Sequence, residues 1–325
     1  MKALVIAEGA LRLEDRETPA PAADQVLVEV AGTGVNRADL LQVGGRYPAP
    51  LGWPEDVPGL EFSGTVVAAG PGVRWLRPGD RVFGIVGGGA HASHVLTTEN
   101  LCALMPEDLD PIAAGGIPEV FITAHDALVT IAGLKPGERV LVHGVGSGVG
   151  TAAVQIARAM GATSVGTART PGKLEKAKEL GLDEGVVAGG ESADAIGEVD
   201  VVVDLIGGDY LAIDVEVCRP KGRIVIVGLL GGAVSELNLG AVMQKRLSIR
   251  GTVLRSRPDH EKAAAVAAFG AQLVPLFADG RLHPVVDKIV PLEQGQEAYD
   301  LVASNATFGK VVLSGGGGKG GGGGS

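Results

Sequence analysis

Residues 140–150 decide the fold of this chain, and they read Val-Leu-Val-His-Gly-Val-Gly-Ser-Gly-Val-Gly. An apolar run ends in a glycine-rich turn, and residues 149–160 continue with the spacing of a helix. A diphosphate must approach the backbone closely, which a Cβ would block, and its charge is met by free N–H groups at the start of a helix. This pattern predicts a dinucleotide site on the backbone between Val145 and Thr151, Gly146 included, with the Ser147 hydroxyl as a further donor.

The surrounding segment gives this turn its context, because the glycine spacing Gly144-x-Gly146-x-Gly148-x-Gly150 differs from the standard G-x-G-x-x-G. Apolar strands alternate with helical segments from about residue 118 to residue 254. The predicted strands are Arg139–His143, Thr163–Ala168, Val199–Leu205, Arg223–Val227 and Leu247–Leu254, and the predicted helices are Val149–Met160 and Lys173–Leu180. This succession predicts an α/β fold with a right-handed, doubly wound parallel Rossmann sheet.

The first third of the chain is rich in short strands instead. Runs rich in Val, Ile or Thr, separated by Pro, Gly and Asp turns, cover Ala3–Ala7, Gln25–Ala31, Gly64–Ala69, Arg81–Val86 and His94–Thr97. This spacing predicts a partly open barrel rather than a layered α/β unit. After residue 257 the pattern predicts helices at Asp259–Phe277 and Leu292–Val302, and strands at Val285–Val290 and Lys310–Leu313.

These last elements are too few for a third domain, so we expect them to rejoin the barrel. Residues 1–117 and 258–314 then form one β-rich domain, and residues 118–257 form a sheet domain inserted between its two parts. Residues 315–325 are glycine apart from Lys319 and the final serine, which predicts a flexible tail without a core.

The composition of the 325 residues excludes several classes of protein. A net charge of −10 argues against nucleic acid as a main partner, because phosphate binding needs a concentrated basic surface. The N-terminus becomes polar too early for a signal peptide, and no apolar run reaches the roughly 18 residues of a membrane helix. We therefore expect a soluble, cytoplasmic protein whose two cysteines, Cys102 and Cys218, are reduced and buried.

The segment after the glycine turn indicates which dinucleotide is bound. A site for NAD places Asp or Glu about 20 residues after the glycines. No acidic residue occurs between Val145 and Leu174. The end of the second predicted strand and the residues that follow it instead carry Thr167, Arg169 and Lys173. These donors and cations can surround a 2′-phosphate, which predicts NADPH. Either cation taken alone can equally be an ordinary surface charge.

Metal and nucleophile chemistry find little support in the sequence. A catalytic zinc site uses Cys, His and acidic ligands, and a structural site uses four close cysteines, but this chain has two distant ones. The pair His91-x-x-His94 has no evident third ligand nearby, so we predict no metal site. No G-x-S-x-G elbow and no P-loop occur. His143 ends a core strand, which favours a structural role.

Longer motifs carry a family resemblance that covers nearly everything from Met1 to Leu313. They are Gly34–Gln42 with Tyr47, Pro58–Gly64, Ile117–Leu128, His143–Ala153, Asp204–Gly208, Gly228–Gly232, Leu254–Arg257 and Gly309–Leu313. Together they resemble the zinc-free quinone oxidoreductases, the zeta-crystallin-like proteins of the medium-chain dehydrogenase/reductase superfamily. The stress-inducible NADPH quinone reductase branch is the most similar. The resemblance implies a GroES-like barrel domain for substrate and catalysis, and a Rossmann domain for NADPH.

The same resemblance implies roles for individual residues. Asn36 and Thr123 would lie near the nicotinamide, and Tyr47 would lie at the substrate mouth. Asn36 as a turn residue and Tyr47 as a simple lid remain alternatives. The resemblance also implies a homodimer formed through edge strands of the Rossmann domain. The cofactor residues that it implies are Ser147, Gly148, Val149, Thr167, Lys173, Gly207, Gly228, Leu229, Leu254, Arg255 and Lys310.

These roles lead to the hypothesis of direct hydride transfer from NADPH to a quinone or a related conjugated carbonyl. The product anion is delocalised and takes a proton from water, so neither a metal nor a strong general acid is required. An enoyl or 2-alkenal reductase, which delivers the hydride to carbon, is the nearest alternative. An NADPH-binding redox sensor or crystallin-like protein with little catalysis is the alternative from a different class.

Overall fold

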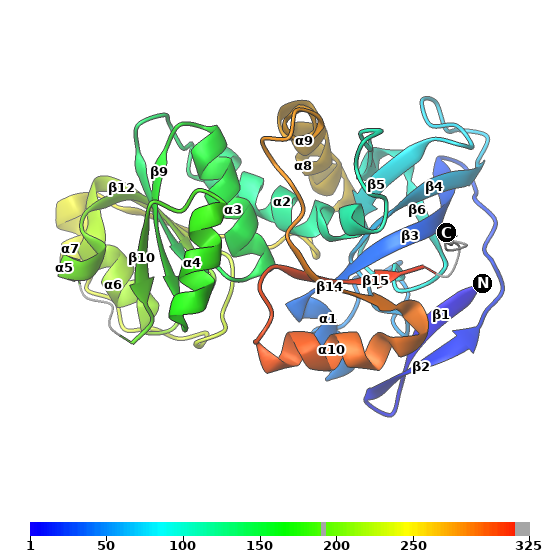
Figure 1. The fold of residues 1–325 in the computed structure, drawn as a ribbon, viewed down its shortest axis with the longest axis horizontal. Coiled ribbons are helices and arrows are strands. Elements are labelled where there is room, and N and C mark those ends of the chain that lie inside the picture. The colour runs from blue at the N-terminus through cyan, green and yellow to red at the C-terminus, as the bar shows by residue number, and fades with distance from the viewer. Residues whose placement is uncertain (190–192, 316–325) are drawn as a thin grey trace, which may run out of the picture. The chain divides into compact units, whose positions relative to one another are not determined.

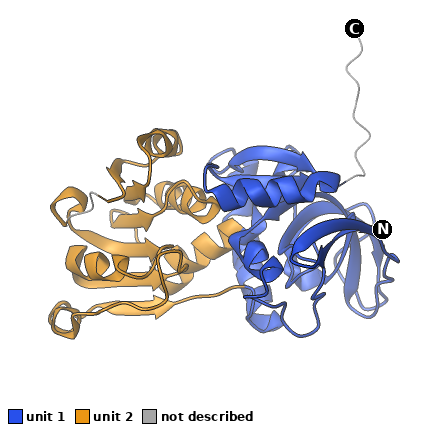
Figure 2. Ribbon diagram, turned by 90° about the horizontal axis from the view of Figure 1, so that it is seen from below, with its two compact units in different colours: residues 1–119, 255–325 blue, residues 120–254 orange. Residues whose placement is uncertain are grey.

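The computed structural model describes residues 1–189 and 193–315, which divide into two compact units (Figure 2). One unit combines Met1–Glu119 with the chain from Arg255 onward, and the other is Val120–Leu254. The predicted domain boundaries, at residues 117/118 and 257/258, lie within three residues of these divisions. The predicted glycine tail lies, beyond Gly315, outside the described residues.

The inserted unit is built on a six-stranded parallel sheet (Figure 1). The strands are β8 (Arg139–His143), β9 (Thr163–Ala168), β10 (Glu184–Val187), β11 (Val199–Asp204), β12 (Cys218–Ile226) and β13 (Ser248–Gly251). They lie in the order β10-β9-β8-β11-β12-β13, and every pair is parallel. This confirms the doubly wound sheet. The direction of winding reverses between β8 and β11, and the carboxyl ends at such a reversal are where these sheets bind ligands.

Helices α2 to α7 accompany this sheet. Their bounds are α2 (Pro118–His125, continued by a π-helical segment over Asp126–Ile131), α3 (Gly148–Ala159), α4 (Pro171–Glu179), α5 (Ala193–Ile196), α6 (Tyr210–Val217) and α7 (Leu239–Lys245). The side chains of Leu141, Val202 and Ile224 on three adjacent strands are fully buried in one apolar cluster. Burial on both faces explains why these strands read as continuous apolar runs rather than as alternating ones.

The other unit contains a mostly antiparallel sheet. Its strands are β3 (Gln25–Val35), β4 (Glu61–Ala69), β5 (Arg81–Ile85), β6 (His94–Thr98), β7 (Cys102–Leu104), β14 (Val286–Pro291) and β15 (Lys310–Ser314). The order is β14-β15-β3-β4-β5-β7, and β6 also pairs with β3. Strands from both ends of the chain therefore share one sheet, as predicted for the GroES-like barrel. Val28, Phe62 and Val82 fill its core.

Smaller elements complete this unit and show where the sequence prediction was imprecise. A hairpin of β1 (Lys2–Ala7) and β2 (Ala10–Asp15) and helix α1 (Arg37–Val43) accompany the sheet. The predicted helix Asp259–Phe277 is two helices, α8 (Asp259–Gln272) and α9 (Val274–Ala278), because Pro275 lacks an N–H group and fits only the first turn of a helix. The helix predicted at Leu292–Val302 is a 3₁₀ turn followed by α10 (Gly295–Ser304).

Both cysteines are free and buried, as predicted, and they lie in different units. Burial raises the pKa of each thiol above its usual range, so neither is a reactive thiolate at neutral pH. None of the helices among the described residues combines the length and apolar character needed to cross a membrane.

Candidate cofactor and active site

Local contacts explain why glycines fill the turn between β8 and α3. Gly144 has a φ of +70°, which residues with a side chain rarely adopt. A Cβ on Gly150 would stand 2.3 Å from the carbonyl oxygen of Gly144, so only glycine lets the first turn of α3 lie against this backbone. The Oγ of Ser147 accepts a hydrogen bond from the Gly150 N–H at 3.0 Å and donates to the Gly144 carbonyl at 2.8 Å.

The same contacts fix the start of helix α3. Gly148 and Val149 are its first two residues, whose N–H groups have no acceptor within a helix. They lie at the carboxyl end of β8, beside the reversal in strand order. The positive end of a twelve-residue helix and a backbone that tolerates no Cβ at position 150 fit the diphosphate of a dinucleotide.

The three residues predicted to meet a 2′-phosphate have different surroundings. Arg169 is exposed, and Lys173 is half-buried. A Cβ on Gly146 would stand 2.8 Å from Cδ of Lys173, so the lysine side chain passes directly over the glycine turn. Thr167 is buried instead, and its Oγ1 lies 3.0 Å from Nδ1 of His143 and accepts a hydrogen bond from the Gly144 N–H at 3.4 Å. The two cations, but not the Thr167 hydroxyl, are thus placed at the surface.

His143 belongs to a buried polar cluster beneath the turn. Its Nε2 lies 2.8 Å from Oδ1 of Asp214 on α6, and both side chains are inaccessible to solvent. The ring of Tyr210 packs edge-on against the imidazole, with the centroids 4.7 Å apart. Burial raises the pKa of Asp214 to about 6, while the hydrogen bond from His143 acts in the opposite direction. With every ring nitrogen engaged, His143 has the structural role that the sequence favoured.

Asp204 shapes the next turn of the sheet. This fully buried carboxylate belongs to the last residue of β11, and its Oδ1 accepts hydrogen bonds from the N–H groups of Ile206 and Gly207 at 2.7 and 2.9 Å. Gly207 has a φ of +67°, and a Cβ on Gly228 would stand 2.5 Å from the Leu205 carbonyl oxygen. Gly207 follows β11 and Gly228 follows β12, so both glycines predicted to line the nicotinamide side lie in closely packed backbone at the carboxyl edge of the sheet.

The remaining predicted residues of this unit differ in exposure. Leu229, next to Gly228, is 56% exposed, whereas Leu254 is buried after β13. Thr123 is half-buried on α2. Their roles at the nicotinamide stay predictions.

In the barrel unit, Asn36 is part of a charged network. Nζ of Lys310 lies 2.8 Å from Oε1 of Glu61, and donates to Oδ1 of Asn36 at 2.6 Å and to the Val35 carbonyl at 2.9 Å. The Asn36 amide donates to Oε1 of Glu61 at 3.0 Å and to the Gly34 carbonyl at 3.1 Å. The resemblance implied a cofactor contact for Lys310, whereas the structure gives its ammonium three protein oxygens.

A second polar chain holds the backbone around Asn36. Asp39 is fully buried, and its carboxylate accepts hydrogen bonds from the N–H groups of Asn36 and Gly59 at 2.7 and 3.1 Å. His91 lies 4.0 Å from this carboxylate, and its Nδ1 lies 2.9 Å from the hydroxyl of Tyr299. Burial lowers the pKa of His91, so the imidazole is neutral at physiological pH. This series of buried polar side chains positions Asn36 through the hydrogen bond from its backbone N–H to Asp39.

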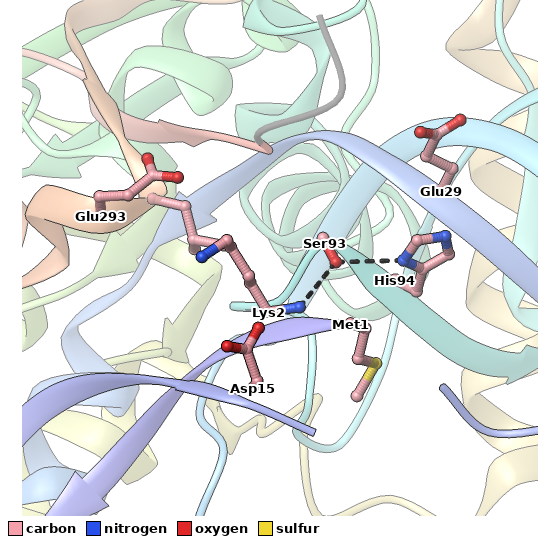
Figure 3. Close-up of a pocket in the computed structure, with 8 residues that line it drawn as sticks. Met1, Lys2, Asp15, Glu29, Ser93, His94 and Glu293 are labelled. Carbon is pink, nitrogen blue, oxygen red and sulfur yellow. Dashed lines mark hydrogen bonds between the residues drawn. The ribbon is translucent and has the colours of Figure 1, made fainter. Parts of the chain in front are cut away.

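His94 points elsewhere, so the pair His91-x-x-His94 does not converge. His94 lines a pocket of about 340 Å³. Its Nδ1 lies 3.1 Å from Oγ of Ser93, and Figure 3 shows the two side chains facing each other. Asp15, Glu29 and Glu293 also line this pocket. In residues 1–189 and 193–315 no group of three or more His, Cys, Asp or Glu side chains is arranged to bind a metal ion.

Arg255, predicted to line the nicotinamide side, is almost fully buried in the barrel unit. Its guanidinium donates to the backbone carbonyls of Gly87 and Tyr47 at 2.9 and 3.0 Å and to Oε1 of Gln42 at 2.5 Å. Its Cζ also lies 4.9 Å from the centre of the Tyr47 ring. Arg255 therefore fixes the loop that carries Tyr47, the residue predicted at the substrate mouth.

Sequence reasoning missed the buried acids Glu61, Asp39, Asp204 and Asp214. The available signal for Glu61 is a charged residue between Leu60 and Phe62 just before a predicted strand, because a charged side chain is buried only where a partner neutralises it. Nothing in the local sequence names that partner.

Glu119, beside Glu61 and Lys310, makes the stability of the fold depend on pH. Burial raises its pKa to about 8, the Glu61 carboxylate adds to this shift, and Lys310 opposes it. The folded protein therefore keeps a proton that the unfolded chain, with a pKa of 4.5, has already released. This contribution to stability is complete below pH 4.5 and is lost as the pH rises towards 8.

We expect Glu119→Gln to raise the melting temperature relative to wild type, by a margin that grows from pH 5 to pH 8 and then levels off. The margin at pH 8 should reach at least about 3 °C. Thermal denaturation followed by circular dichroism at pH 5, 6.5, 8 and 9 measures it. A margin independent of pH would contradict the shift.

Family models and relatives match nearly the whole of the chain. The family model of the alcohol dehydrogenase GroES-like domain matches residues 22–133, and that of the zinc-binding dehydrogenases matches residues 148–271. The chain is 34% identical to NorB, a spectinabilin polyketide synthase system protein of Streptomyces orinoci, over 92% of its own length. It spans only 5% to 13% of the length of this and two other polyketide synthase proteins that it matches.

Two solved structures have the same fold along both chains. Escherichia coli quinone oxidoreductase complexed with NADPH matches with a TM-score of 0.83 and 27% identity, covering 96% of this chain and 98% of that one. The CurK enoyl reductase matches with the same TM-score, identity and coverage. The quinone oxidoreductase of Sus scrofa is 34% identical over an alignment of 314 residues that covers 92% of this chain and 92% of that one. The chain therefore belongs to the quinone oxidoreductase family of the medium-chain dehydrogenase/reductase superfamily.

Proposed function

We propose that this protein is an NADPH-dependent enzyme that passes a hydride directly to a quinone or a related conjugated carbonyl. The observation that carries the proposal is the turn between β8 and α3, where the backbone leaves no room for a Cβ on Gly150 and leads into a helix N-terminus. Such a turn suits a dinucleotide diphosphate. The acceptor follows from family membership, since the pig and E. coli relatives are quinone oxidoreductases by name.

NADPH, when bound, would supply the hydride, and Ser147, Gly148 and Val149 would hold its diphosphate. The protein contributes orientation, for which Asn36, Tyr47 and Thr123 remain the proposed contacts of the nicotinamide and the acceptor. A hydroquinone anion is delocalised, so water can protonate it without a dedicated acid. The proposed chemistry therefore needs no further side chain at the reacting atoms.

The preference for NADPH rests on Arg169 and Lys173. We expect Arg169→Ala combined with Lys173→Ala to weaken NADPH binding by roughly thirtyfold, because two charge-assisted contacts with the 2′-phosphate are lost. NADH lacks this phosphate, so its dissociation constant should change less than about twofold. Fluorescence titration with each nucleotide measures both constants.

The matched control is Lys178→Ala on the same helix, whose ammonium pairs with Glu175 at the surface. It should leave both constants unchanged. Equal weakening of NADPH and NADH in the double variant would show that the cations do not select the phosphate.

The acceptor is tested by following NADPH absorbance with a panel of quinones and 2-alkenals. Turnover of quinones well above that of alkenals is the expected result. The reverse order would favour the enoyl reductase alternative, which the CurK structure and the polyketide synthase relatives support. Binding of NADPH with no oxidation by either class would indicate a redox sensor instead.

We also propose that the protein is a homodimer formed through the edge of the parallel sheet. Six of the twelve exposed large apolar side chains in the described chain fall between residues 229 and 253, the segment that contains edge strand β13. They include Leu239 and Met243 on α7, which are 70% and 76% exposed. Exposed apolar side chains that gather on one surface mark an interaction site, and we propose that these do so.

We expect Leu239→Glu combined with Met243→Glu to convert the dimer to monomers, because two carboxylates would be buried without partners. Light scattering after size exclusion measures the mass. Leu51→Glu, at a fully exposed position in the barrel unit, is the control and should leave the mass unchanged. A wild-type protein with the mass of one chain would reject the proposal.

A further inference from the structure

Every N–H group of the Lys310 ammonium has an acceptor within the protein. An ammonium has three N–H groups, and three oxygens surround this one: Oε1 of Glu61, Oδ1 of Asn36 and the carbonyl of Val35. The Lys310 side chain is 5% exposed and that of Glu61 is 0% exposed. A phosphate would have to displace one of these acceptors and separate a buried ion pair, which is strongly unfavourable.

The same contacts decide which way the Asn36 amide faces. Lys310 can only donate, so the atom that faces it must be Oδ1. An ionised Glu61 can only accept, so the atom that faces it must be Nδ2. The Gly34 carbonyl accepts from the same nitrogen. An inverted amide would place donor against donor and acceptor against acceptor.

The backbone is built to hold this arrangement. Strands β15 and β3 pair with Val311 opposite Val35, which brings Lys310 beside Asn36. A Cβ on Gly34 would stand 2.3 Å from Oε1 of Glu61 and 2.8 Å from Cε of Lys310, so glycine at this position makes room for the ion pair. Asp39 holds the Asn36 N–H at 2.7 Å.

We propose that Lys310 is a positioning residue that, together with Glu61, fixes the Asn36 amide, and that it is not a ligand of the cofactor phosphates. Both N–H groups of Asn36 are then used within the protein, and one lone pair of Oδ1 remains. Asn36 can therefore only accept a hydrogen bond from its ligand. It suits a hydroxyl or amide N–H group of the bound molecule and not the carbonyl oxygen of a quinone. This inference rests on the proposed function.

The test uses Glu61→Gln combined with Lys310→Met, because this pair of changes leaves no buried charge without a partner. We expect the turnover number to fall at least about tenfold, while the NADPH dissociation constant stays within about threefold of wild type. If Lys310 instead bound a phosphate of the cofactor, the dissociation constant of NADPH would rise while the turnover number at saturating NADPH would change little. Weakening of NADPH binding by tenfold or more would overturn the proposal.

A double-mutant cycle shows whether Lys310 acts through Asn36. Asn36→Ala should lower the turnover number in the wild-type background, but by less than about twofold when Glu61 and Lys310 are already replaced. If Asn36→Ala lowers the turnover number by the same factor in both backgrounds, Lys310 and Glu61 do not act through Asn36, and the proposal is overturned. Lys288→Met is the control, since Lys288 lies on the neighbouring strand β14 in an exposed ion pair with Glu297. Its turnover number and its NADPH dissociation constant should both match those of wild type.

Failure of the proposed function is distinguishable from failure of this inference. The first would be seen in wild type, as absence of NADPH binding or of quinone turnover. If wild type reduces alkenals only, the quinone assignment fails, and the same cycle run with an alkenal still decides the role of Lys310. A wild type that binds no nucleotide overturns both.

Discussion

Replacing Gly150 by alanine is expected to weaken NADPH binding at least about a hundredfold. The added Cβ would lie 2.3 Å from the Gly144 carbonyl oxygen and 2.7 Å from Cα of Val145, and both contacts are with backbone that no rotamer change can relieve. The start of α3 must therefore move away from β8. A displacement of about 1 Å in a group that orients a ligand can cost a hundredfold. Fluorescence titration with NADPH measures the effect.

The control for this substitution is Gly172→Ala in the same unit. Gly172 lies in α4 with no atom within 4 Å of an added Cβ, so alanine there should change the NADPH dissociation constant less than about twofold. The Gly150 variant should remain folded by circular dichroism, because the clash is confined to one turn. Normal NADPH binding by the Gly150 variant would refute the glycine-turn site on which the proposed function depends.

Replacing His143 by leucine is expected to destabilise the protein by about 3–5 kcal/mol, the cost of leaving a buried charge without its partner. Asp214 would keep no hydrogen bond from a side chain, since its Oδ2 already has no partner among the described residues. Protonation of Asp214 relieves this cost, so the loss of stability should be smaller at pH 5 than at pH 7.5. Urea denaturation at both pH values measures it.

A compensating variant separates this explanation from a loss of packing. His143→Leu combined with Asp214→Leu removes both polar partners, and replacing a buried pair by apolar residues is often neutral. We expect the double variant to recover most of the lost stability. If both variants are equally unstable, the damage comes from the fit around Tyr210 and Thr167 and not from an unpaired carboxylate.

The sequence predicted the elements that have a local signature. The bounds of β8 and β9 matched the prediction residue for residue. The apolar run of β8 ends directly before Gly144, and β9 ends shortly before Pro171, which begins the next helix. Helix α6 was missed because Tyr210–Val217 is apolar almost throughout and shows no stripe of helical spacing. Strand β2 was also missed, since Arg12 and Glu14 leave it no run of apolar residues.

The polar networks could not be predicted, because their partners are distant in the sequence. Asp214 is 71 residues from His143, and Lys310 is 274 residues from Asn36. A lysine on a terminal strand and an asparagine before a short helix carry no local sign that they meet. Resemblance to a family supplied Asn36 as a site residue, but only the register of β15 against β3 shows what holds its amide.

The pairing of β15 with β3 also sets an order of events during synthesis. All six strands of the inserted sheet lie between residues 139 and 251, so this unit has everything it needs once that stretch has left the ribosome. The barrel must wait for residues 310–314, which fill the place between β3 and β14. A nascent chain therefore completes its nucleotide-binding half first. Lys310 arrives with the closing strand, so the Asn36 network forms only after β15 has been synthesised.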